Sequence, residues 1–227
     1  MSDFFRFPHT PHLAWLGDGS PRDDKVLSPV EARALLAGDV VVEEKLDGAN
    51  LGISVDEAGM LRLQNRGQYL LPPFRGQFSR AGGWLAQHAC AMATGLGQGL
   101  ILFGEWCAAR HSVRYDQMPD WFLAFDVYDR TARRFWSTSR RDALVRSLDL
   151  SLVPCLARGR MTLDAVKARV LTGSSCFGPT PMEGVVIRRE RPDYLDQRAK
   201  LVKPDFTQAI TEHWRDRPIE WNAVTHN

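Results

Sequence analysis

Short apolar runs recur along the chain from residue 40 onward, each bounded by turn residues, and this spacing is typical of strands. Leu51–Val55 and Met60–Gln64 flank Asp56–Gly59, which predicts a hairpin. Further strands are expected at Val40–Val42, Leu100–Phe103, Trp121–Val127, Gly184–Ile187 and Arg198–Val202. Helices are expected at 82–97, Asp142–Leu148, Leu163–Val170 and Thr207–Trp214, with Ser139 and Thr162 as caps of the second and third. The order favours an α+β domain built on antiparallel sheets.

The first 30 residues are rich in Pro, Gly, Asp and Ser, so we expect an extended arm with little regular structure. Ser28 then has the features of a helix N-cap, because Pro29 suits the first helical position and Glu31 completes a capping box. This helix should run to about Leu36 and end at Gly38.

The composition limits the class of protein. A chain of 227 residues can bury one sizeable core but is short for two full domains. No apolar run reaches the roughly 18 residues of a membrane span, and the N-terminus lacks the pattern of a signal peptide, so we expect a cytoplasmic protein without a membrane partner. The four cysteines form no C-x-x-C pair, which argues against a zinc site or a disulfide framework.

The net charge of +2 does not by itself demand a nucleic-acid partner, but the basic residues are clustered. One cluster holds Arg130, Arg133, Arg134, Arg140 and Arg141, and a second holds Arg188, Arg189, Arg191, Arg198, Lys200 and Lys203. Such clusters can follow a phosphate backbone. They can equally be solvated charged faces.

The segment Lys45-Leu46-Asp47-Gly48 follows a predicted strand. A lysine held there, before a glycine turn, becomes a nucleophile if burial or neighbouring positive charge lowers its pKa. The alternative is a surface lysine beside a β-turn.

Several strand ends downstream of Lys45 carry residues suited to a nucleotide. They are Phe103-Gly104-Glu105, Phe125-Asp126, Glu183 to Arg188 and Arg198 to Lys203. A nucleoside triphosphate needs an aromatic face for its base, a carboxylate for its ribose hydroxyls and cations for its phosphates, and a divalent metal needs carboxylates. Because residues two apart share a strand face, Arg198 and Lys200 should point into one pocket and Lys203 away from it. Each residue alone could be core or solvated surface.

The ordered series EKLDGAN, NRG, LFGEWC, FLAFDVYD, EGVVIR and RAKLVKPDF, spanning about residues 40 to 206, resembles the motif set of the covalent nucleotidyltransferase superfamily. That superfamily holds polynucleotide ligases and mRNA capping enzymes. The resemblance is nearest to ATP-dependent RNA ligases of the RNA ligase 2 type, because Phe103 stands where DNA ligases usually have Asp and because residues 109–115 are similar to RNA-ligase-like proteins.

The resemblance implies a fold and a division of the chain. The fold would be a nucleotidyltransferase (ATP-grasp-like ligase adenylation) domain of antiparallel sheets flanked by helices. Residues 1–38 would be an arm and helix packed on an adenylyltransferase domain of residues 39–227. We expect no separate C-terminal OB-fold or helical domain, because about twenty residues follow the last motif.

The resemblance also implies roles. Lys45 would take AMP, with Glu183 and Lys200 as further catalytic residues. Glu44 would help to read the adenine, with Glu43 as the competing candidate because it shares a strand face with Lys45. The remaining nucleotide contacts would be Leu46, Asp47, Arg66 (at the nucleic-acid end or the ribose-phosphate), Glu105 (ribose hydroxyls), Phe125 (adenine stacking), and Arg188 and Lys200 (phosphates). Asp126 and Glu183 would bind metal. Relatives often carry Lys at the Arg188 position, and Arg has a different hydrogen-bond geometry.

The implied cofactors are ATP and magnesium or manganese. The implied partners are RNA ends or a nicked duplex, together with a protein that would replace the missing C-terminal domain. Three alternatives stay open: a DNA ligase with the same site, a capping guanylyltransferase, and a non-catalytic module that binds nucleic-acid ends. His111 could touch RNA or a phosphate, or be a loop histidine bonded to backbone. His9 and His12 make only a weak metal site without further ligands.

Overall fold

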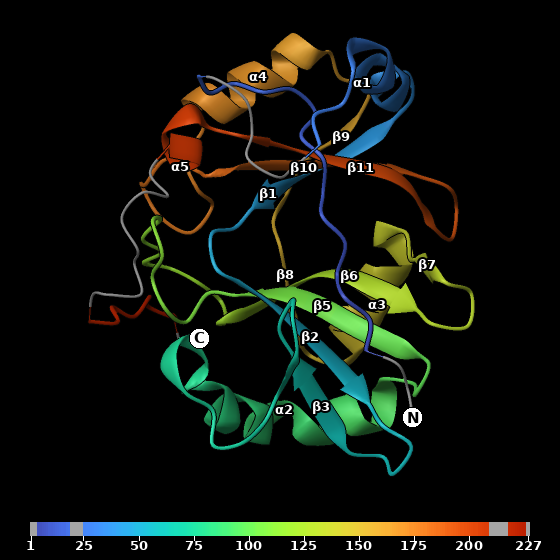
Figure 1. Cartoon of the computed structure of the whole chain (residues 1–227), viewed down its shortest axis with the longest axis vertical. Coiled ribbons are helices and arrows are strands. Elements are labelled where there is room, and N and C mark those ends of the chain that lie inside the picture. The colour runs from blue at the N-terminus through green and yellow to red at the C-terminus, as the bar shows by residue number, and fades with distance from the viewer. Residues whose placement is uncertain (1–3, 19–24, 209–217, 226–227) are drawn as a thin grey trace.

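The chain folds into two stacked β-sheets (Figure 1). The computed structural model describes residues 4–18, 25–208 and 218–225. The upper sheet has the strand order β11 (Leu195–Val202), β10 (Gly184–Glu190), β1 (Val40–Lys45) and β9 (Cys155–Gly159). Its pairs are all antiparallel.

The lower sheet has the order β4 (Tyr69–Leu70), β3 (Leu61–Gln64), β2 (Ala49–Val55), β5 (Leu100–Trp106), β6 (Phe122–Asp129) and β7 (Arg134–Phe135). These strands pair antiparallel, as the hairpins of the sequence predict. The predicted antiparallel sheets are confirmed, and the short strand β8 (Ser151–Leu152) adds one parallel pairing, with β6. The α+β class is confirmed.

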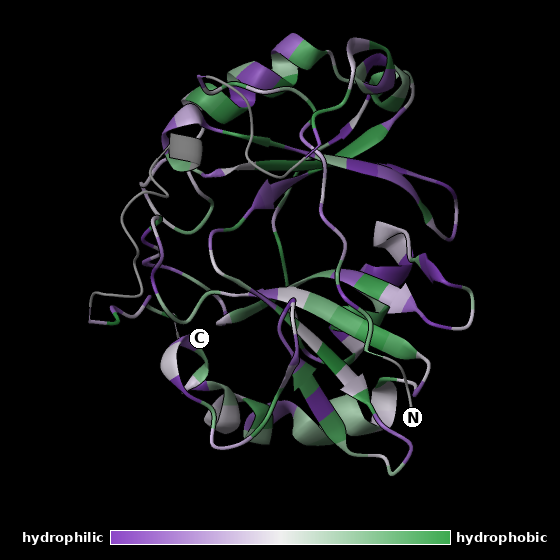
Figure 2. Ribbon diagram, in the orientation of Figure 1, coloured by the Kyte–Doolittle hydropathy of each residue, from purple (hydrophilic) through white to green (hydrophobic). Residues whose placement is uncertain are grey.

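Helices cover the outer faces of the two sheets, and each sheet has its own hydrophobic core. Helices α1 (Pro29–Leu36) and α4 (Leu163–Thr172) pack on the upper sheet, in a core that includes Leu35, Val166 and Ile187. Helices α2 (Ala81–Gly95) and α3 (Thr138–Ser147) pack on the lower sheet around Trp106 and Phe122. The one-turn helices η1 (Gly76–Phe78) and α5 (Pro204–Gln208) complete the set. The apolar residues of these two cores thus lie on the outer, helix-covered faces. Figure 2 shows that the end of β1 is hydrophilic where it enters the space between the sheets.

The structure confirms most of the predicted helix starts and corrects one. Ser28 accepts from the backbone of Glu31, and the Glu31 side chain accepts from Ser28 N, which is the expected capping box. Thr162 caps α4 as expected. The Ser139 cap is wrong, because α3 begins at Thr138 after Ser137. Ser137 Oγ instead donates to the Pro192 carbonyl, so a contact with the upper sheet fixes this helix start.

The N-terminal arm, residues 4–18, crosses in front of both sheets from the lower to the upper one (Figure 1). Its backbone pairs with β11: Lys200 N donates to Pro11 O at 2.8 Å and Leu13 N donates to Lys200 O at 2.7 Å. The arm therefore walls one side of the space between the sheets. The predicted closing helix lies mostly in residues 209–217, outside the described residues.

Within those described ranges, no helix combines the length and apolar character that a membrane crossing requires.

Candidate active site

A cavity of about 1320 Å³ lies between the two sheets. It is lined by the ends of strands from both sheets and by the N-terminal arm. Eleven residues singled out from the sequence line it together: Glu43, Glu44, Lys45, Leu46, Arg66, Glu105, Phe125, Asp126, Glu183, Arg188 and Lys200. Segments 157 residues apart along the chain thus meet in one cleft, as the motif order implies.

Lys45, the last residue of β1, lies at the centre of this cleft. The register that pairs Lys45 with Gly184 brings Glu183 alongside it, and Lys45 Nζ donates to Glu183 Oε2 at 2.7 Å. Burial lowers the pKa of Lys45, but the carboxylates of Glu183 and Glu105 more than offset this and hold the pKa above its usual value. The two carboxylates therefore favour the ammonium form of Lys45, whereas the predicted nucleophile requires a lowered pKa.

The two carboxylates beside Lys45, those of Glu105 and Glu183, also have raised pKa values. Burial raises the pKa of Glu105 and of Glu183 to about 7 each, and the nearby Lys45 charge moderates the shift. Each carboxylate also raises the pKa of the other. Two buried carboxylates of like charge favour the arrival of a cation or a proton.

The turn after Lys45 is packed tightly against β5. Gly48 N donates to Glu105 Oε1 at 3.2 Å, and a Cβ on Gly48 would lie 2.6 Å from the Trp106 carbonyl oxygen. Only glycine allows this approach. The turn therefore fixes Lys45 and Glu105 relative to each other.

Asp47 does not line the cleft. Its carboxylate accepts from Ser112 N at 2.6 Å and Val113 N at 2.8 Å, and its backbone N–H donates to Tyr115 Oη at 2.8 Å. It anchors the segment after β5 beneath the Lys45 turn. His111 lies outside the cavity lining as well: its Nε2 is 2.8 Å from Gln77 Oε1, and burial followed by the nearby Lys45 charge lowers its pKa, against the pull of Asp47.

Phe125 and Glu44 offer surfaces that suit a purine. Phe125 is half-buried on the cavity wall, and its ring meets Phe7 of the arm edge-on at 5.3 Å. Glu44 Oε2 accepts from Cys176 N at 2.9 Å. Glu44 Oε1 is buried and has no hydrogen-bond partner in the described part of the chain.

Glu43 and Asp126 belong to a buried network of ion pairs between the sheets. Arg141 binds Glu43 at 2.6 Å. Arg188 binds Asp126 at 2.7 Å and lies 3.7 Å from Glu43. The second Asp126 oxygen pairs with Arg198.

This network restricts the roles its members can take. Each Asp126 oxygen already accepts from an arginine, and Arg188, 1% exposed, is already bound to Asp126, so a metal or a phosphate would have to share these groups with the network. The residues that the structure describes contain no group of three or more His, Cys, Asp or Glu side chains placed to hold a metal ion.

The positions of the basic side chains on and after β11 agree with the alternation of side chains along a strand. Arg198 and Lys200 line the cleft, whereas Lys203 is buried away from it. Exposed Arg66 reaches the cavity from the turn between β3 and β4.

Several residues that line the cleft were assigned no role from the sequence. Phe7 and Trp15 of the arm line the cleft, and so does Asn50 on β2. Arg141 was seen only as a member of a basic cluster, although it is one of the largest fully buried side chains. The arm residues could not be found because their place depends on the long-range pairing with β11.

The fold is similar to that of solved RNA ligases. Naegleria gruberi RNA ligase with PPi matches with a TM-score of 0.57 and 20% identity, over 82% of this chain and 54% of that one. A variant of the same ligase with ATP and Mn gives a TM-score of 0.61 and 17% identity, over 88% and 63%. An archaeal ATP-dependent RNA ligase gives 0.55 and 19%, over 87% and 48%. The chain thus spans about half to two thirds of these proteins.

Comparison with curated protein sequences gives no match. The family model for RNA ligase matches residues 38–202, which is most of the chain and includes every strand of the cleft. The chain belongs to the RNA ligase family.

Proposed function

We propose that this protein is an ATP-dependent RNA ligase that forms a lysyl-AMP intermediate on Lys45 and joins a 5′-phosphate to a 3′-hydroxyl. The observation that carries the proposal is the position of Lys45, 2.7 Å from Glu183 in a cleft that also holds Glu105, Phe125 and Lys200. Membership of the RNA ligase family supports RNA as the polymer. The similar Naegleria ligase studied with ATP and Mn supports ATP and a divalent cation.

The residues that line the cleft favour one orientation of ATP, with separate groups for the adenine, the ribose and the phosphates. Phe125 provides the aromatic face for the adenine. Glu44 Oε1 is buried and has no hydrogen-bond partner among the described residues, so it suits the adenine amino group, because an unsatisfied buried acceptor is costly until a donor arrives. Glu43 is the weaker candidate, since Arg141 already binds it. Glu105 would bind the ribose hydroxyls, and Arg66 and Lys200 the phosphates.

The first step is nucleotidyl transfer to Lys45. Lys45 must lose its proton before it attacks, and Glu183, whose carboxylate lies 2.7 Å from Nζ, is the group placed to receive it. The neutral Nζ attacks the α-phosphorus of ATP, a P–N bond forms, the bond to the β-phosphate oxygen breaks, and pyrophosphate leaves.

A divalent cation fits this site on the donor set alone. Magnesium is commonly held by one or two carboxylates together with substrate phosphates. Glu105 and Glu183 are such a pair, and both have pKa values raised by burial. When bound, the cation would offset charge on the transferring phosphate.

Two further transfers complete the joining. An oxygen of the RNA 5′-phosphate attacks the phosphorus of the lysyl-AMP, the P–N bond breaks, and Lys45 regains a proton. The RNA 3′-hydroxyl then attacks the activated 5′-phosphate, a phosphodiester forms, and AMP leaves. Lys200 would offset the negative charge at the phosphates through both transfers.

The test is a nick-sealing assay with α-labelled ATP and nicked duplexes of RNA, DNA and RNA–DNA hybrid. We expect the label on the protein first and sealed RNA afterwards. Sealing of DNA alone would identify a DNA ligase, and labelling by GTP in preference to ATP would identify a capping enzyme. A protein that binds the ends and takes no label would be the non-catalytic module.

A further inference from the structure

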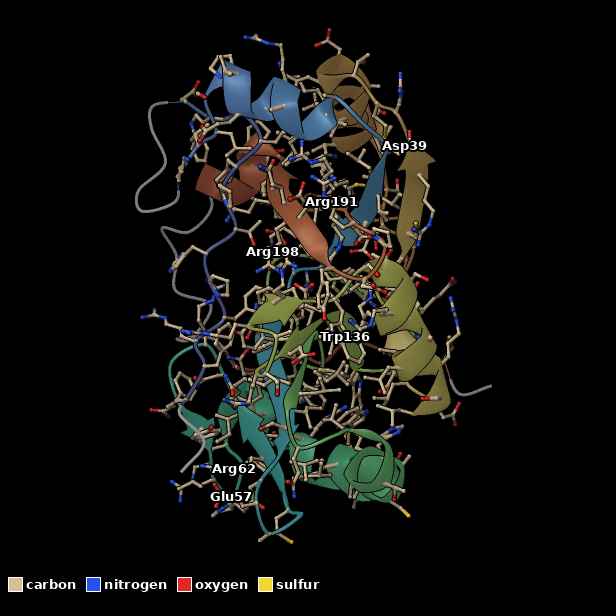
Figure 3. All side chains as sticks on the ribbon, turned by 90° about the vertical axis from the view of Figure 1, so that its right-hand side faces the viewer. Asp39, Glu57, Arg62, Trp136, Arg191 and Arg198 are labelled. Carbon is tan, nitrogen blue, oxygen red and sulfur yellow. The ribbon has the colours of Figure 1, made fainter. Side chains whose placement is uncertain are left out.

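The two arginine clusters of the sequence divide in the structure into a buried set and a surface set. Arg141, Arg188 and Arg198 join the buried network between the sheets. Four of the others lie near Trp136 and Tyr194, and both clusters contribute: Arg134 and Arg140 stack on these rings, Arg133 precedes Arg134 in the chain, and the Arg191 backbone donates to the Tyr194 carbonyl. We call these six residues the arginine–aromatic face. Figure 3 shows Trp136 and Arg191 on the side turned to the viewer.

Ring stacking orders this face. The Arg140 guanidinium lies 4.0 Å over the Trp136 ring and 5.2 Å over the Tyr194 ring. Arg134 lies 5.0 Å over Tyr194 from another direction. A bridge between Trp136 and Tyr194 ties the lower sheet to the β10–β11 hairpin here. The arginines therefore project from a fixed base, so less side-chain freedom is lost when a ligand binds.

The charge of this face is only partly neutralised. Arg191 lies 3.9 Å from Asp196, which also binds Arg189. Arg133, Arg134 and Arg140 have no ion pair within the described ranges of the chain. The nearby carboxylate of Asp129 accepts from the backbone of Thr131 and Ala132, and Asp193 adjoins Tyr194 in the chain.

A guanidinium placed over a ring keeps N–H groups at its edge. These N–H groups match a phosphate. The face also adjoins the cleft. Phe135, next to Trp136, packs under Arg198 at 4.4 Å, and the Trp136 carbonyl accepts from Arg188 at 3.4 Å.

We propose that the arginine–aromatic face binds the phosphate backbone of the RNA strand that enters the cleft. This proposal rests on the proposed function and adds the surface that would hold the polymer. Nucleotidyl transfer to Lys45 needs only the cleft, whereas RNA binding and sealing need this face as well.

The test compares two triple variants. Arg133→Gln/Arg134→Gln/Arg140→Gln removes three charges from the face. Arg33→Gln/Arg62→Gln/Arg160→Gln removes three charges elsewhere and includes one stacked arginine, because Arg62 lies 3.9 Å over Tyr69. The probe is a 5′-phosphorylated single-stranded RNA, measured by fluorescence anisotropy from low to physiological salt, with thermal unfolding as the check on folding.

We expect the first variant to bind RNA more weakly and with a smaller salt slope. The slope is that of the logarithm of the binding constant against the logarithm of the salt concentration, and each lost contact to a single strand reduces it by about 0.7. Three lost contacts therefore reduce it by about 2. When the salt concentration rises fourfold, the difference in affinity between the variant and wild type should shrink about 20-fold. The control variant should bind like wild type. Labelling by ATP should be equal in all three proteins.

Two results would overturn the proposal: wild-type RNA affinity in the first variant, or equal losses in both variants. Neither result would contradict the transfer of AMP to Lys45. Absence of labelling in the wild-type protein would instead contradict the proposed function, and RNA affinity that depends on the face would then still support the binding surface.

Discussion

At the residue scale, the proposed function depends on the protonation of Lys45. Its ammonium is held by Glu183 at 2.7 Å, and Glu183 with Glu105 keeps the pKa of the amine high. Glu183→Gln removes the stronger of these influences while burial remains, so the pKa of Lys45 should fall. NMR titration of ¹³C-methylated lysines measures this, with Lys45→Arg to assign the signal. Glu220→Gln, an exposed carboxylate paired with Arg110, is the matched control and should change nothing.

Phe125 is the second residue on which the account depends. A base stacked on an aromatic face is typically worth about 1–3 kcal/mol, so Phe125→Ala should weaken the use of ATP about ten- to a hundredfold. Phe125→Tyr keeps the ring and should stay close to wild type. The ring also touches Phe7, so thermal unfolding must accompany the kinetics. Loss of the fold in Phe125→Ala would make this residue part of the core instead.

At the scale of elements, the contact between β1 and α3 depends on one buried arginine. Arg141 of α3 binds Glu43 at 2.6 Å and donates to the Phe125 carbonyl at 2.6 Å. Arg141→Met leaves Glu43 buried with only the more distant Arg188, and breaking a buried pair in this way costs about 3–5 kcal/mol. Urea unfolding should show that loss. Arg146→Met, on the same helix and largely exposed, should lower the free energy of unfolding by less than about 1 kcal/mol. Equal effects would contradict the role of the network.

Elements whose signals are local were predictable from the sequence. The start of α1 follows from the Ser28–Glu31 capping box, and the β2–β3 hairpin follows from the turn at Asp56–Gly59. The start of α3 was not predictable, because Ser137 and Thr138 are fixed by Pro192 and Glu190 of the upper sheet. Strand β9 was missed as well, since its residues alternate poorly and it is fixed by pairing with β1.

At the scale of the whole molecule, the cleft exists because two sheets with separate cores face each other. The ordered motifs predicted which residues meet there, since each lies on a strand or beside one. They could not predict which side chains would be satisfied by one another. Asp126 and Arg188 bind each other at 2.7 Å, and Asp47 holds the backbone of residues 112 and 113. Such pairings depend on how the sheets stack, which no local pattern contains.

The most direct test of the account is to locate the covalent adduct. The protein is incubated with ATP and magnesium, and peptide mass spectrometry then maps any added adenylyl group. We predict one AMP per chain, on Lys45 through a phosphoramide bond that acid cleaves, and no adduct in Lys45→Arg. An adduct on another residue, or one that persists in Lys45→Arg, would show that Lys45 is not the residue that takes AMP.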